Sequence, residues 1–376
     1  MESADVVIAG AGIIGLSLAL DLAAHGLRVT VLERARAMAE ASWAAAGMLA
    51  ANDPENPFQL RELSQRSAHE YPAWLAQIEQ LSGRKVPFRT QTTLQAFAYG
   101  EAPAQTALTA PELRRLVPDL IAGNLTFIRL DERSLDPRDL CAALPLAAKA
   151  AGVKLIENAS VISISPEENQ VTVQTPATPI VAAHFINCAG AWAPSPALGR
   201  FSPANPAVTP CKGQMTTVRL KDQQNLLIVL RTPGFYVVPR GDGRVTIGAT
   251  VEDCGFDKTV QPQAIARLLQ SAARLWPPIA HAEVFESWAG LRPASADLLP
   301  LLGQMGHPRC WIATGHFRNG ILLAPGTASV LSQLVRGTVP EIDLTPFDPA
   351  RFGSGNTRPL DRLVPRSSDK PATAAL

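Results

Sequence analysis

The chain has 376 residues, of which 47% are hydrophobic and 18% are charged, and its formal net charge is +1. This length predicts two or three domains' worth of chain and a core large enough to enclose a cofactor. The balanced charge gives no field that favours nucleic acid or an acidic membrane, and no apolar run reaches the roughly 18 residues that a membrane span needs. We therefore expect a protein that binds neither nucleic acid nor membrane.

The first residues and the cysteines indicate the compartment. Glu2 and Asp5 stand where a signal peptide would carry basic residues and an apolar core, so we expect no signal peptide. The five cysteines are scattered and include no C-x-x-C pair, which argues against a disulfide framework and a zinc site. We expect a cytoplasmic protein without a structural metal.

The chain begins with the pattern of a dinucleotide-binding unit. Residues 5–9 form a short apolar run typical of a buried parallel strand, residues 13–25 have helical spacing, and residues 28–33 form a second strand. The first turn reads G-x-G-x-x-G, with Gly10, Gly12 and Gly15 at the glycine positions. This combination of strand, glycine-rich turn, helix and strand predicts a Rossmann start.

Each glycine of this turn has a physical role. Gly10 permits the tight turn, Gly12 allows close approach of a pyrophosphate, and Gly15 allows helix and strand to pack closely. The free N–H groups at the helix start then face the phosphates. Glu33 ends the second strand, where a carboxylate can accept hydrogen bonds from ribose hydroxyls and disfavours a 2′-phosphate. The turn alone leaves NAD and FAD open.

The remaining pattern predicts helices and two kinds of sheet. Helices are expected at 58–82, 136–151, 262–276 and 319–336, and strands at 86–99, 153–164, 171–175, 183–188 and 310–314. Between residues 209 and 251, short strands alternate with turn signals such as Arg240–Gly243, which predicts an antiparallel sheet distinct from the first.

Five strings along the chain resemble signatures of the D-amino-acid oxidase superfamily of FAD-dependent oxidoreductases. They are Ser42–Leu49 (SWAAAGML), Asn187–Trp192 (NCAGAW), Phe235–Arg240 (FYVVPR, followed by IGAT at 247–250), Ala289–Pro293 (AGLRP) and Gly315–Ile321 (GHFRNGI). Within the superfamily they are most similar to the glycine oxidases of thiazole (thiamine) biosynthesis. The resemblance extends from about residue 5 to residue 336.

The resemblance implies an α/β protein (α+β overall) of the D-amino-acid oxidase type. A Rossmann-like FAD-binding domain would comprise residues 1–85, 136–208 and 286–340, and an antiparallel-sheet substrate domain residues 86–135 and 209–285. Residues 341–376 are rich in Pro and Ser without periodicity, and we expect this tail to be largely disordered.

The resemblance also implies a non-covalently bound FAD. Its expected binding residues are Gly10, Gly12, Ile13, Ile14, Gly15, Glu33, Arg34, Ser42, Ala46, Gly47, Met48, Val161, Gly190, Gly315, His316, Phe317, Arg318, Asn319, Gly320 and Ile321. The turn at 315–320 follows a strand and opens a helix, so its N–H groups and helix dipole would lie against the flavin edge where negative charge develops. Cys310 is expected to be a core thiol, not a flavin attachment site.

At the substrate end, a planar guanidinium suits the carboxylate of an amino acid. The resemblance implies that Arg318 pairs with this carboxylate and that Arg292 lines the same pocket, while Tyr236 adds a hydrogen bond. Val251 stands where the compared glycine oxidases carry methionine, so the pocket should differ near the α-carbon. We expect His316 to belong to the cofactor turn and not to act as a base.

The implied reaction oxidises glycine, sarcosine, D-alanine or D-proline to the imine. Dioxygen would reoxidise the flavin to give hydrogen peroxide, and the imine would be hydrolysed to an oxo acid and ammonia or used for thiazole synthesis. Two alternatives stay open: a dehydrogenase for a D-amino acid or proline that passes electrons to a quinone or a partner, and a non-catalytic NAD-binding module or redox sensor. Family members are often homotetramers, so we expect a homo-oligomer.

Overall fold

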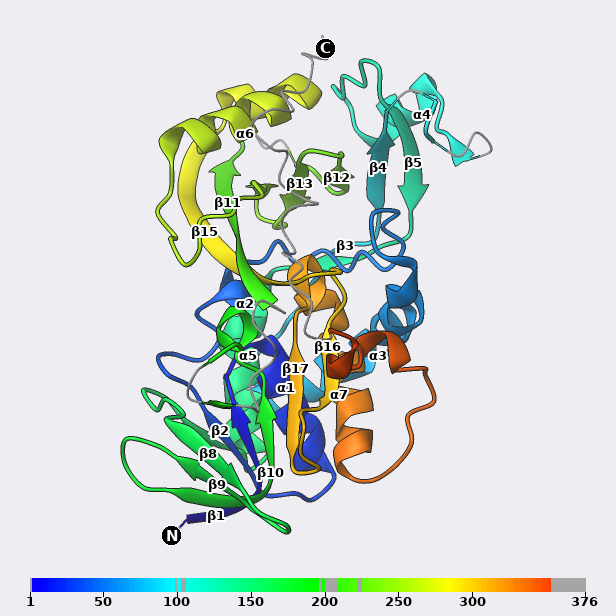
Figure 1. Cartoon of the computed structure of the whole chain (residues 1–376). Helices are drawn as coiled ribbons and strands as arrows, with labels where there is room; N and C mark the ends of the chain where they lie inside the picture. Colours follow the sequence, from blue (N-terminus) through cyan, green and yellow to red (C-terminus); the bar gives the residue numbers. More distant parts are fainter. Residues whose placement is uncertain are drawn as a thin grey trace.

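The computed structural model describes residues 2–98, 100–102, 106–195, 198–199, 208–221 and 225–352. These residues form two large sheets, one in the lower and one in the upper half of the view in Figure 1. The two halves meet in a central region to which the segment after the second strand, the ends of several strands and the start of the last long helix contribute.

The first sheet has eight strands and a parallel centre. Its parallel strands are β1 (Glu2–Ala9), β2 (Val29–Leu32), β7 (Lys154–Ile156), β10 (Ile180–Asn187) and β17 (Cys310–Thr314), in the order β17-β10-β1-β2-β7. Three further strands pair antiparallel: β16 (Leu301–Gln304) with β17, β9 (Val171–Gln174) with β10, and β8 (Ser163–Pro166) with β9. Residues 6–8 of β1 are fully buried, as expected for a parallel strand covered on both faces.

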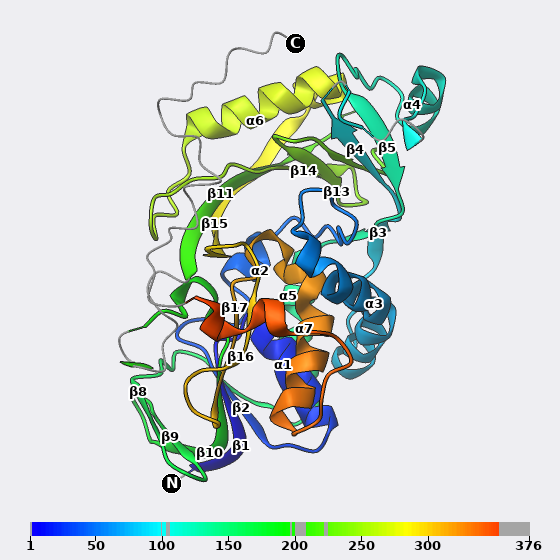
Figure 2. The same ribbon diagram turned by 45° about the vertical axis from the view of Figure 1, so that its right-hand side comes forward.

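Four long helices lie on one side of this sheet (Figure 2). They are α1 (Ile13–Ala24), α3 (Arg61–Ser82), α5 (Pro137–Ala150) and α7 (Gly320–Val335). Helix α3 packs on the outside of α5 and α7. The Asp136 carboxylate caps α5 by accepting a hydrogen bond from the Arg138 N–H, which satisfies one of the free donors of the first turn. Helices α3 and α7 pack closely because Gly326 faces Ser67, where a Cβ would lie 2.9 Å from the Ser67 Cβ.

The second sheet has seven strands in the order β15-β11-β14-β13-β12-β4-β5. The strands are β4 (Thr93–Phe97), β5 (Thr126–Leu130), β11 (Val208–Arg219), β12 (Val229–Arg231), β13 (Tyr236–Pro239), β14 (Arg244–Gly248) and β15 (Glu283–Ser295). All neighbours are antiparallel except β4 and β12. Helix α6 (Pro262–Leu275) buries Leu268 and Ala272 in the core of this sheet, and α4 (Ala110–Leu116) adds Leu113.

The other face of the second sheet packs on the segment that follows β2. Trp288 lies in one apolar cluster with Ala44 and Ala46, and its indole N–H donates to the Ala44 carbonyl at 3.1 Å. Ala44 ends the short helix α2 (Ala41–Ala44), and a Cβ at Gly290 would lie 2.4 Å from the Ala44 Cβ. A small sheet of β3 (Phe88–Thr90) and β6 (Ser134–Leu135) lies where the chain passes between the two halves.

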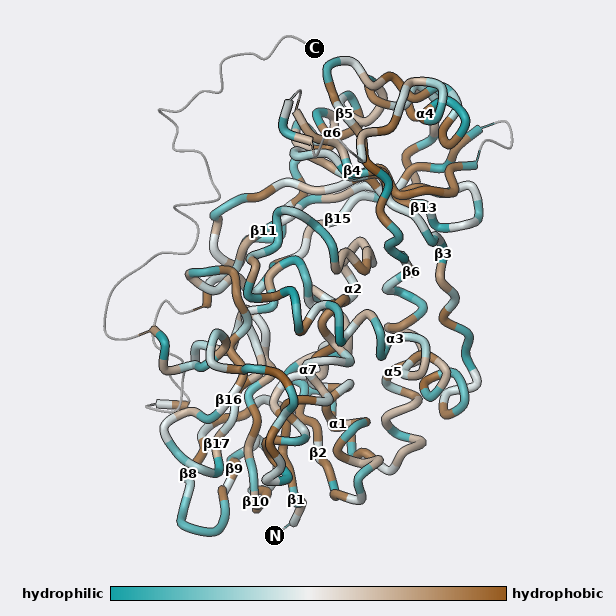
Figure 3. Tube along the Cα trace, turned by 90° about the vertical axis from the view of Figure 1, so that its right-hand side faces the viewer, coloured by the Kyte–Doolittle hydropathy of each residue, from teal (hydrophilic) through white to brown (hydrophobic). Residues whose placement is uncertain are grey.

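The hydropathy of the chain follows this architecture. In Figure 3, hydrophobic stretches run along the strands of the first sheet and along α1, whereas the turn beside β8 is hydrophilic. Among the described residues, no helix combines the length and apolar character that crossing a membrane requires.

The predicted mixed α/β fold with a Rossmann-like start is confirmed, and several local expectations are corrected. The strand expected over 153–164 is two strands, since β7 ends at Ile156 and β8 begins at Ser163. The second sheet contains one parallel pair. Strand β15 continues through residue 285, and the division of the chain into two domains stays a prediction.

The first part of the C-terminal tail has secondary structure and packs against the rest of the chain. Residues 345–351 form two short 3₁₀ helices, Phe347 is fully buried, and Arg351 pairs with Asp297 at 2.8 Å. The buried Phe347 side chain and the Arg351–Asp297 ion pair therefore hold this segment against the rest of the chain, despite its polar composition. The rest of the tail, residues 353–376, lies outside the described residues.

Candidate active site

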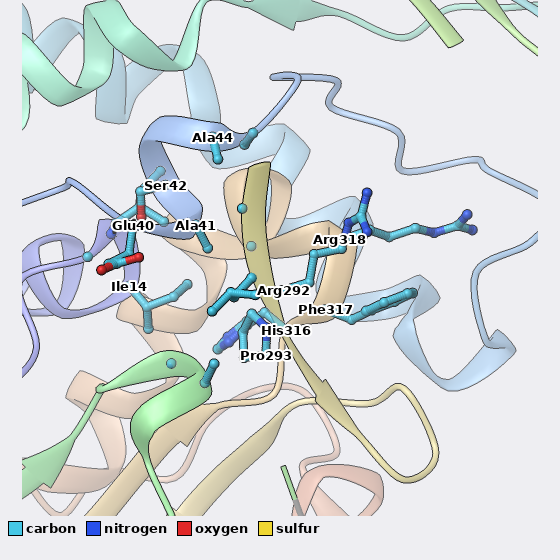
Figure 4. Close-up of a pocket in the computed structure, with 18 of the residues that line it drawn as sticks. Ile14, Glu40, Ala41, Ser42, Ala44, Arg292, Pro293, His316, Phe317 and Arg318 are labelled. Carbon is cyan, nitrogen blue, oxygen red and sulfur yellow. Dashed lines mark hydrogen bonds between the residues drawn. The ribbon is translucent and has the colours of Figure 1, made fainter. Parts of the chain in front are cut away.

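A cavity of about 700 Å³ lies between the two halves of the molecule. It extends from the first glycine-rich turn, past the segment after β2 and the turn after β10, to the inner face of the second sheet and the turn before α7. Figure 4 shows Ser42, Ile14, His316 and Arg292 around it. The sequence-predicted residues that line it are Gly10, Gly12, Ile13, Ile14, Glu33, Arg34, Ser42, Ala46, Gly47, Met48, Val161, Gly190, Tyr236, Val251, Arg292, His316, Phe317, Arg318, Asn319, Gly320 and Ile321.

Gly15 and Gly315 do not line the cavity but shape its walls. A Cβ at Gly15 would lie 2.0 Å from the Gly10 carbonyl oxygen, so only glycine allows α1 to start this close to β1. Gly315 has a φ of +77°, and a Cβ there would lie 2.9 Å from a methyl group of Leu301.

The first turn leaves backbone where a side chain would otherwise stand. Gly10 has a φ of +103°, and a Cβ would lie 2.5 Å from the Cys188 carbonyl oxygen. Gly12 caps α1 with no side-chain hydrogen bond. The Ser42 hydroxyl accepts the Ile13 N–H at 2.9 Å, so one donor of this helix start is already satisfied and a polar hydroxyl stands beside the others. This bare, donor-rich turn fits a pyrophosphate.

The acid that ends β2 stands next to this turn. One oxygen of Glu33 accepts the Ala11 N–H at 2.9 Å and the other accepts the Ala35 N–H at 3.1 Å. These bonds fix the carboxylate in the cavity wall, where it can accept further hydrogen bonds from a diol. Arg34 lies 3.8 Å above the ring of Trp192 and 3.1 Å from Glu40, so this corner of the cavity is bounded by a stacked arginine.

The turn before α7 carries a buried, neutral histidine. His316 is 2% exposed, and its Nε2 lies 3.1 Å from the Thr327 hydroxyl. Burial lowers its pKa to about 3, so the ring is uncharged at neutral pH. Phe317 has a φ of +47° at the start of the 3₁₀ turn Phe317–Asn319. The His316 imidazole is thus packed into the turn before α7.

Arg318 projects from this turn and is already paired. Its guanidinium lies 2.6 Å from a Glu55 oxygen and 3.3 Å from an Asp53 oxygen. Asp53 and Glu55 also line the cavity. In the structure the arginine expected to bind a substrate carboxylate therefore binds two carboxylates of the chain itself (Figure 4 shows its side chain directed away from Arg292).

Arg292 has a different environment. Its guanidinium lies over Gly213, where a Cβ would stand 2.3 Å from a terminal nitrogen, and it donates to the Thr250 carbonyl at 3.1 Å. Among the described residues, no ion pair joins Arg292 to a carboxylate. Burial raises the pKa of Tyr236, and the positive charge of Arg292 opposes this shift, which places the phenol near the guanidinium. Val251, 39% exposed, lines the cavity beside Thr250.

Several lining residues were not predicted from the sequence. Asp53 and Glu55 lie in the loop between α2 and α3 and belong to none of the five strings that resemble the superfamily. Arg231 lies in β12 and is buried against Glu132 at 3.0 Å. Gly213 follows Lys212 in a strand, and only the position of Arg292 across the sheet reveals why no side chain can stand there.

The described residues include neither a group that could hold a metal ion nor a thiol whose pKa is lowered. Within the part of the chain that the structure describes, no group of three or more His, Cys, Asp or Glu side chains could hold a metal ion. All five cysteines are free thiols, and burial raises the pKa of Cys310 to about 11, so this thiol stays protonated.

Comparisons with known proteins agree with this geometry. The family model described as "FAD dependent oxidoreductase" (DAO) matches residues 5–334. The glycine oxidase of Pseudomonas aeruginosa is 33% identical over 365 residues, which are 92% of this chain and 98% of that protein. The bifunctional protein ThiO/ThiG of Trichormus variabilis is 35% identical over 370 residues, and the chain spans only about half of its length, 55%.

Solved structures of two oxidases are similar to this chain over most of its length. The glycine oxidase of Geobacillus kaustophilus superposes with a TM-score of 0.86 and 30% identity, covering 94% of this chain and all of that one. The iminodiacetate oxidase of Chelativorans sp. BNC1 superposes with a TM-score of 0.81 and 26% identity, covering 92% and 98% of the two chains. The chain therefore belongs to the FAD dependent oxidoreductase family of D-amino-acid oxidase type, and FAD is its cofactor.

Proposed function

We propose that this chain oxidises glycine and other small amino acids, including sarcosine, D-alanine and D-proline, with FAD as the oxidant. The observation that carries the proposal is Arg292. It is a guanidinium in the cofactor cavity that hydrogen-bonds to backbone carbonyls, lies beside the Tyr236 phenol and, among the described residues, has no carboxylate partner. An α-amino acid supplies the carboxylate that this pair of groups is suited to bind.

The proposal gives the main anchoring role to Arg292, where the sequence favoured Arg318. Arg318 already contacts Asp53 and Glu55, so a substrate carboxylate would have to compete with two acids of the chain. At Arg292 it would replace only water on the free edge of the guanidinium. Tyr236 would donate its phenolic hydrogen to the same carboxylate, because its raised pKa keeps the hydroxyl protonated.

The residues around the first turn would hold the cofactor. The bare backbone at Gly10 and Gly12 and the start of α1 would bind the pyrophosphate, and Glu33 would accept hydrogen bonds from the ribose. When bound without a covalent link, FAD supplies the two-electron acceptor for the C–H bond next to the amine. The chain then has to hold the neutral amine and its α-carbon in line with that acceptor and exclude water, which is a positioning effect.

No proton-transfer residue is assigned. His316 is buried and neutral with its Nε2 turned to Thr327, so it is unsuited to accept the amine proton, and the amine would react in its neutral form. Val251, being short and partly exposed, would leave room beside the α-carbon for a methyl group or a small ring.

We further propose that dioxygen reoxidises the flavin to give hydrogen peroxide. The imine formed from glycine or D-alanine would be hydrolysed to an oxo acid and ammonia, and that formed from sarcosine to the oxo acid and methylamine. The glycine imine could instead be consumed in thiazole formation for thiamine, a role that the ThiO/ThiG relatives support. We also propose a cytoplasmic homo-oligomer, as the family resemblance implies.

The test is an aerobic peroxide assay of the purified protein with glycine, sarcosine, D-alanine, D-proline and L-proline. We expect peroxide formation to be fastest with glycine or sarcosine. A yellow protein that forms no peroxide but bleaches without oxygen when an amino acid is added would be a dehydrogenase, and the proposed acceptor would be wrong. A yellow protein that neither bleaches nor forms peroxide with any of the five would refute the proposed function.

A further inference from the structure

The two arginines of the substrate end differ in what surrounds them. Arg318 contacts two carboxylates, at 2.6 Å for Glu55 and 3.3 Å for Asp53, whereas Arg292 donates to the carbonyls of Thr250 and, at 3.5 Å, Lys212. Both arginines line the same cavity, together with Tyr236. Of the two, and among the described residues, only Arg318 is paired with carboxylates of the chain.

The segment that carries Asp53 and Glu55 is joined to the turn before α7 at one end and closed on itself. The Asn319 amide donates to the Asn56 side-chain oxygen at 2.9 Å, and the Asn56 amide donates to the Ala50 carbonyl at 3.0 Å. The first bond holds Asn56 against the turn, and the second closes the loop of residues 50–56. The two acids are therefore kept on Arg318 by the backbone of the loop as well as by their charge.

Asp53 is also part of a buried charge network. Its side chain is 7% exposed and lies 3.8 Å from Arg231, which pairs with Glu132 at 3.0 Å. Arg231 is thus occupied by Glu132 as well as by Asp53. On the cavity wall, Arg318 faces two carboxylates, Asp53 and Glu55, so negative charge exceeds positive charge around Arg318. Glu55 differs from Asp53 because its side chain is 48% exposed, and Arg318 is its ion-pair partner among the described residues.

We propose that Asp53 and Glu55 mask Arg318 and so restrict the enzyme to substrates with a single carboxylate. A substrate with a second carboxylate would meet the negative side of the cavity, and like charges placed together are strongly unfavourable. Without the mask, Arg318 would become a second carboxylate site. This inference rests on the proposed function and adds to it the class of substrate that the site rejects.

Sarcosine and iminodiacetate form a matched pair of substrates for the test. They differ only in the second carboxylate, which replaces a hydrogen of the N-methyl group. The measured quantity is kcat/KM for iminodiacetate divided by kcat/KM for sarcosine, from peroxide formation by the holoenzyme. We expect Glu55→Gln to raise this ratio about tenfold, because it removes one negative charge beside the incoming carboxylate, and Asp53→Asn to raise it as well.

Two controls separate the mask from a general effect of charge. Glu62→Gln removes an exposed carboxylate at the start of α3, outside the cavity, and we expect it to leave the ratio unchanged. Adding Arg318→Met to Glu55→Gln should abolish the gain, because the unmasked site is then gone. A ratio that stays constant in Glu55→Gln and Asp53→Asn, or a gain that survives the loss of Arg318, would overturn the proposal.

A binding measurement keeps the mask testable if the proposed function fails. Acetate and malonate carry one and two carboxylates, and their Kd values can be read from the change in the visible absorption of the bound flavin. We expect Glu55→Gln to tighten malonate about tenfold relative to acetate. If the wild-type protein oxidises none of the five amino acids, the proposed function is refuted while this titration still decides the mask. An unchanged malonate-to-acetate ratio would refute the mask.

Discussion

Arg292 and Arg318 follow similar glycine-containing strings in the sequence, and only their surroundings separate them. The structure places Arg292 over a glycine and against carbonyl oxygens, whereas Arg318 lies between two acids. A free guanidinium beside a protonated phenol is the better carboxylate site, because no existing ion pair has to be broken.

The first prediction concerns Arg292. Replacing Arg292 by Met should lower kcat/KM for glycine about 100-fold, because the substrate carboxylate loses its charged partner. Arg292→Lys should retain part of the activity, since the charge remains but the bidentate geometry does not. Steady-state kinetics check this, and the flavin content should match that of the wild type. An Arg292→Met enzyme within twofold of wild type would contradict the assignment.

His316 gives a prediction about stability and pH. Burial lowers its pKa to about 3 in the folded protein, from 6.5 for an unperturbed histidine. Below pH 6.5 only the unfolded chain takes up this proton, so the stabilising contribution is complete above pH 6.5 and is lost as the pH falls toward 3. Its loss amounts to about 1.4 kcal/mol per pH unit.

The measurement compares thermal unfolding of wild type and His316→Gln from pH 7 to pH 4. We expect the Tm of wild type minus the Tm of His316→Gln to decrease as the pH falls, because histidine titrates in this range and glutamine does not. A difference in Tm that is constant over this range would show that His316 is protonated in the folded protein or that it is not buried.

At the scale of elements, local patterns were sufficient where an element has a regular period and clear ends. The first strand–helix–strand unit, α3, α5, α6 and α7 all lie within a few residues of their predicted ranges. Strand β15 was not predicted, because Gly290 and Pro293 interrupt its alternation and its pairing with β11 is set by residues far away in the sequence. The parallel pair of β4 and β12 has no local signal either.

A bridge between strand β11 and the segment that follows β14 orients Arg292 indirectly. Residue 252 bridges to Lys212 on β11, with backbone hydrogen bonds in both directions at 3.0 Å. The Lys212 ammonium is fully buried and has no hydrogen-bond partner among the described residues. It lies 3.7 Å from the Glu252 carboxylate and 3.8 Å from the Asp257 carboxylate. Glu252 also accepts the Thr250 hydroxyl. This bridge therefore holds the Thr250 carbonyl on which Arg292 rests.

We predict that Glu252→Gln raises KM for glycine several-fold while kcat changes less, because Arg292 loses its orientation but the cofactor turn is untouched. Loss of one of the two carboxylates beside the buried Lys212 ammonium should also lower the free energy of unfolding by about 1 kcal/mol, which would be measured as a lower Tm. Asp253→Asn is the matched control, since it removes the neighbouring exposed carboxylate. Equal effects of the two substitutions on KM would argue against a positioning role for Glu252.

At the scale of the whole molecule, the site is formed by the meeting of two sheets, which limited what the sequence could predict. The residues in glycine-rich strings were predicted because a backbone that touches a dinucleotide has a recognisable pattern. Asp53, Glu55 and Gly213 were missed, because each acquires its role only from a partner in another segment: Arg318 for the two acids and Arg292 for the glycine.

A strap from the second sheet crosses to the first at the cavity rim. We define it as residues 252–258, which follow β14. Phe256 stacks on Trp192 with ring centroids 5.3 Å apart, Trp192 carries Arg34 on its ring, and Lys258 pairs with Glu40 at 2.9 Å. Since Arg34, Glu40 and Trp192 all line the cavity, the strap should help to retain the cofactor.

We predict that Phe256→Ala combined with Lys258→Met raises the Kd of the apoprotein for FAD about fivefold, the size expected for an exposed ion pair and one ring contact. Flavin fluorescence during reconstitution measures it. Lys85→Met, which removes an exposed lysine elsewhere, should leave the Kd unchanged. The strap would have no role in retention if both proteins bound FAD with the affinity of the wild type.

The central claim is that one chain binds FAD and presents a small amino acid to it through Arg292. Anaerobic addition of glycine to the purified holoenzyme, followed by the visible absorption of the flavin, tests this most directly because it requires no assumption about the electron acceptor. We expect glycine to bleach the wild-type flavin, and methylamine, which lacks the carboxylate, to leave it oxidised. Bleaching by methylamine as readily as by glycine, or bleaching by no small amino acid, would contradict the claim.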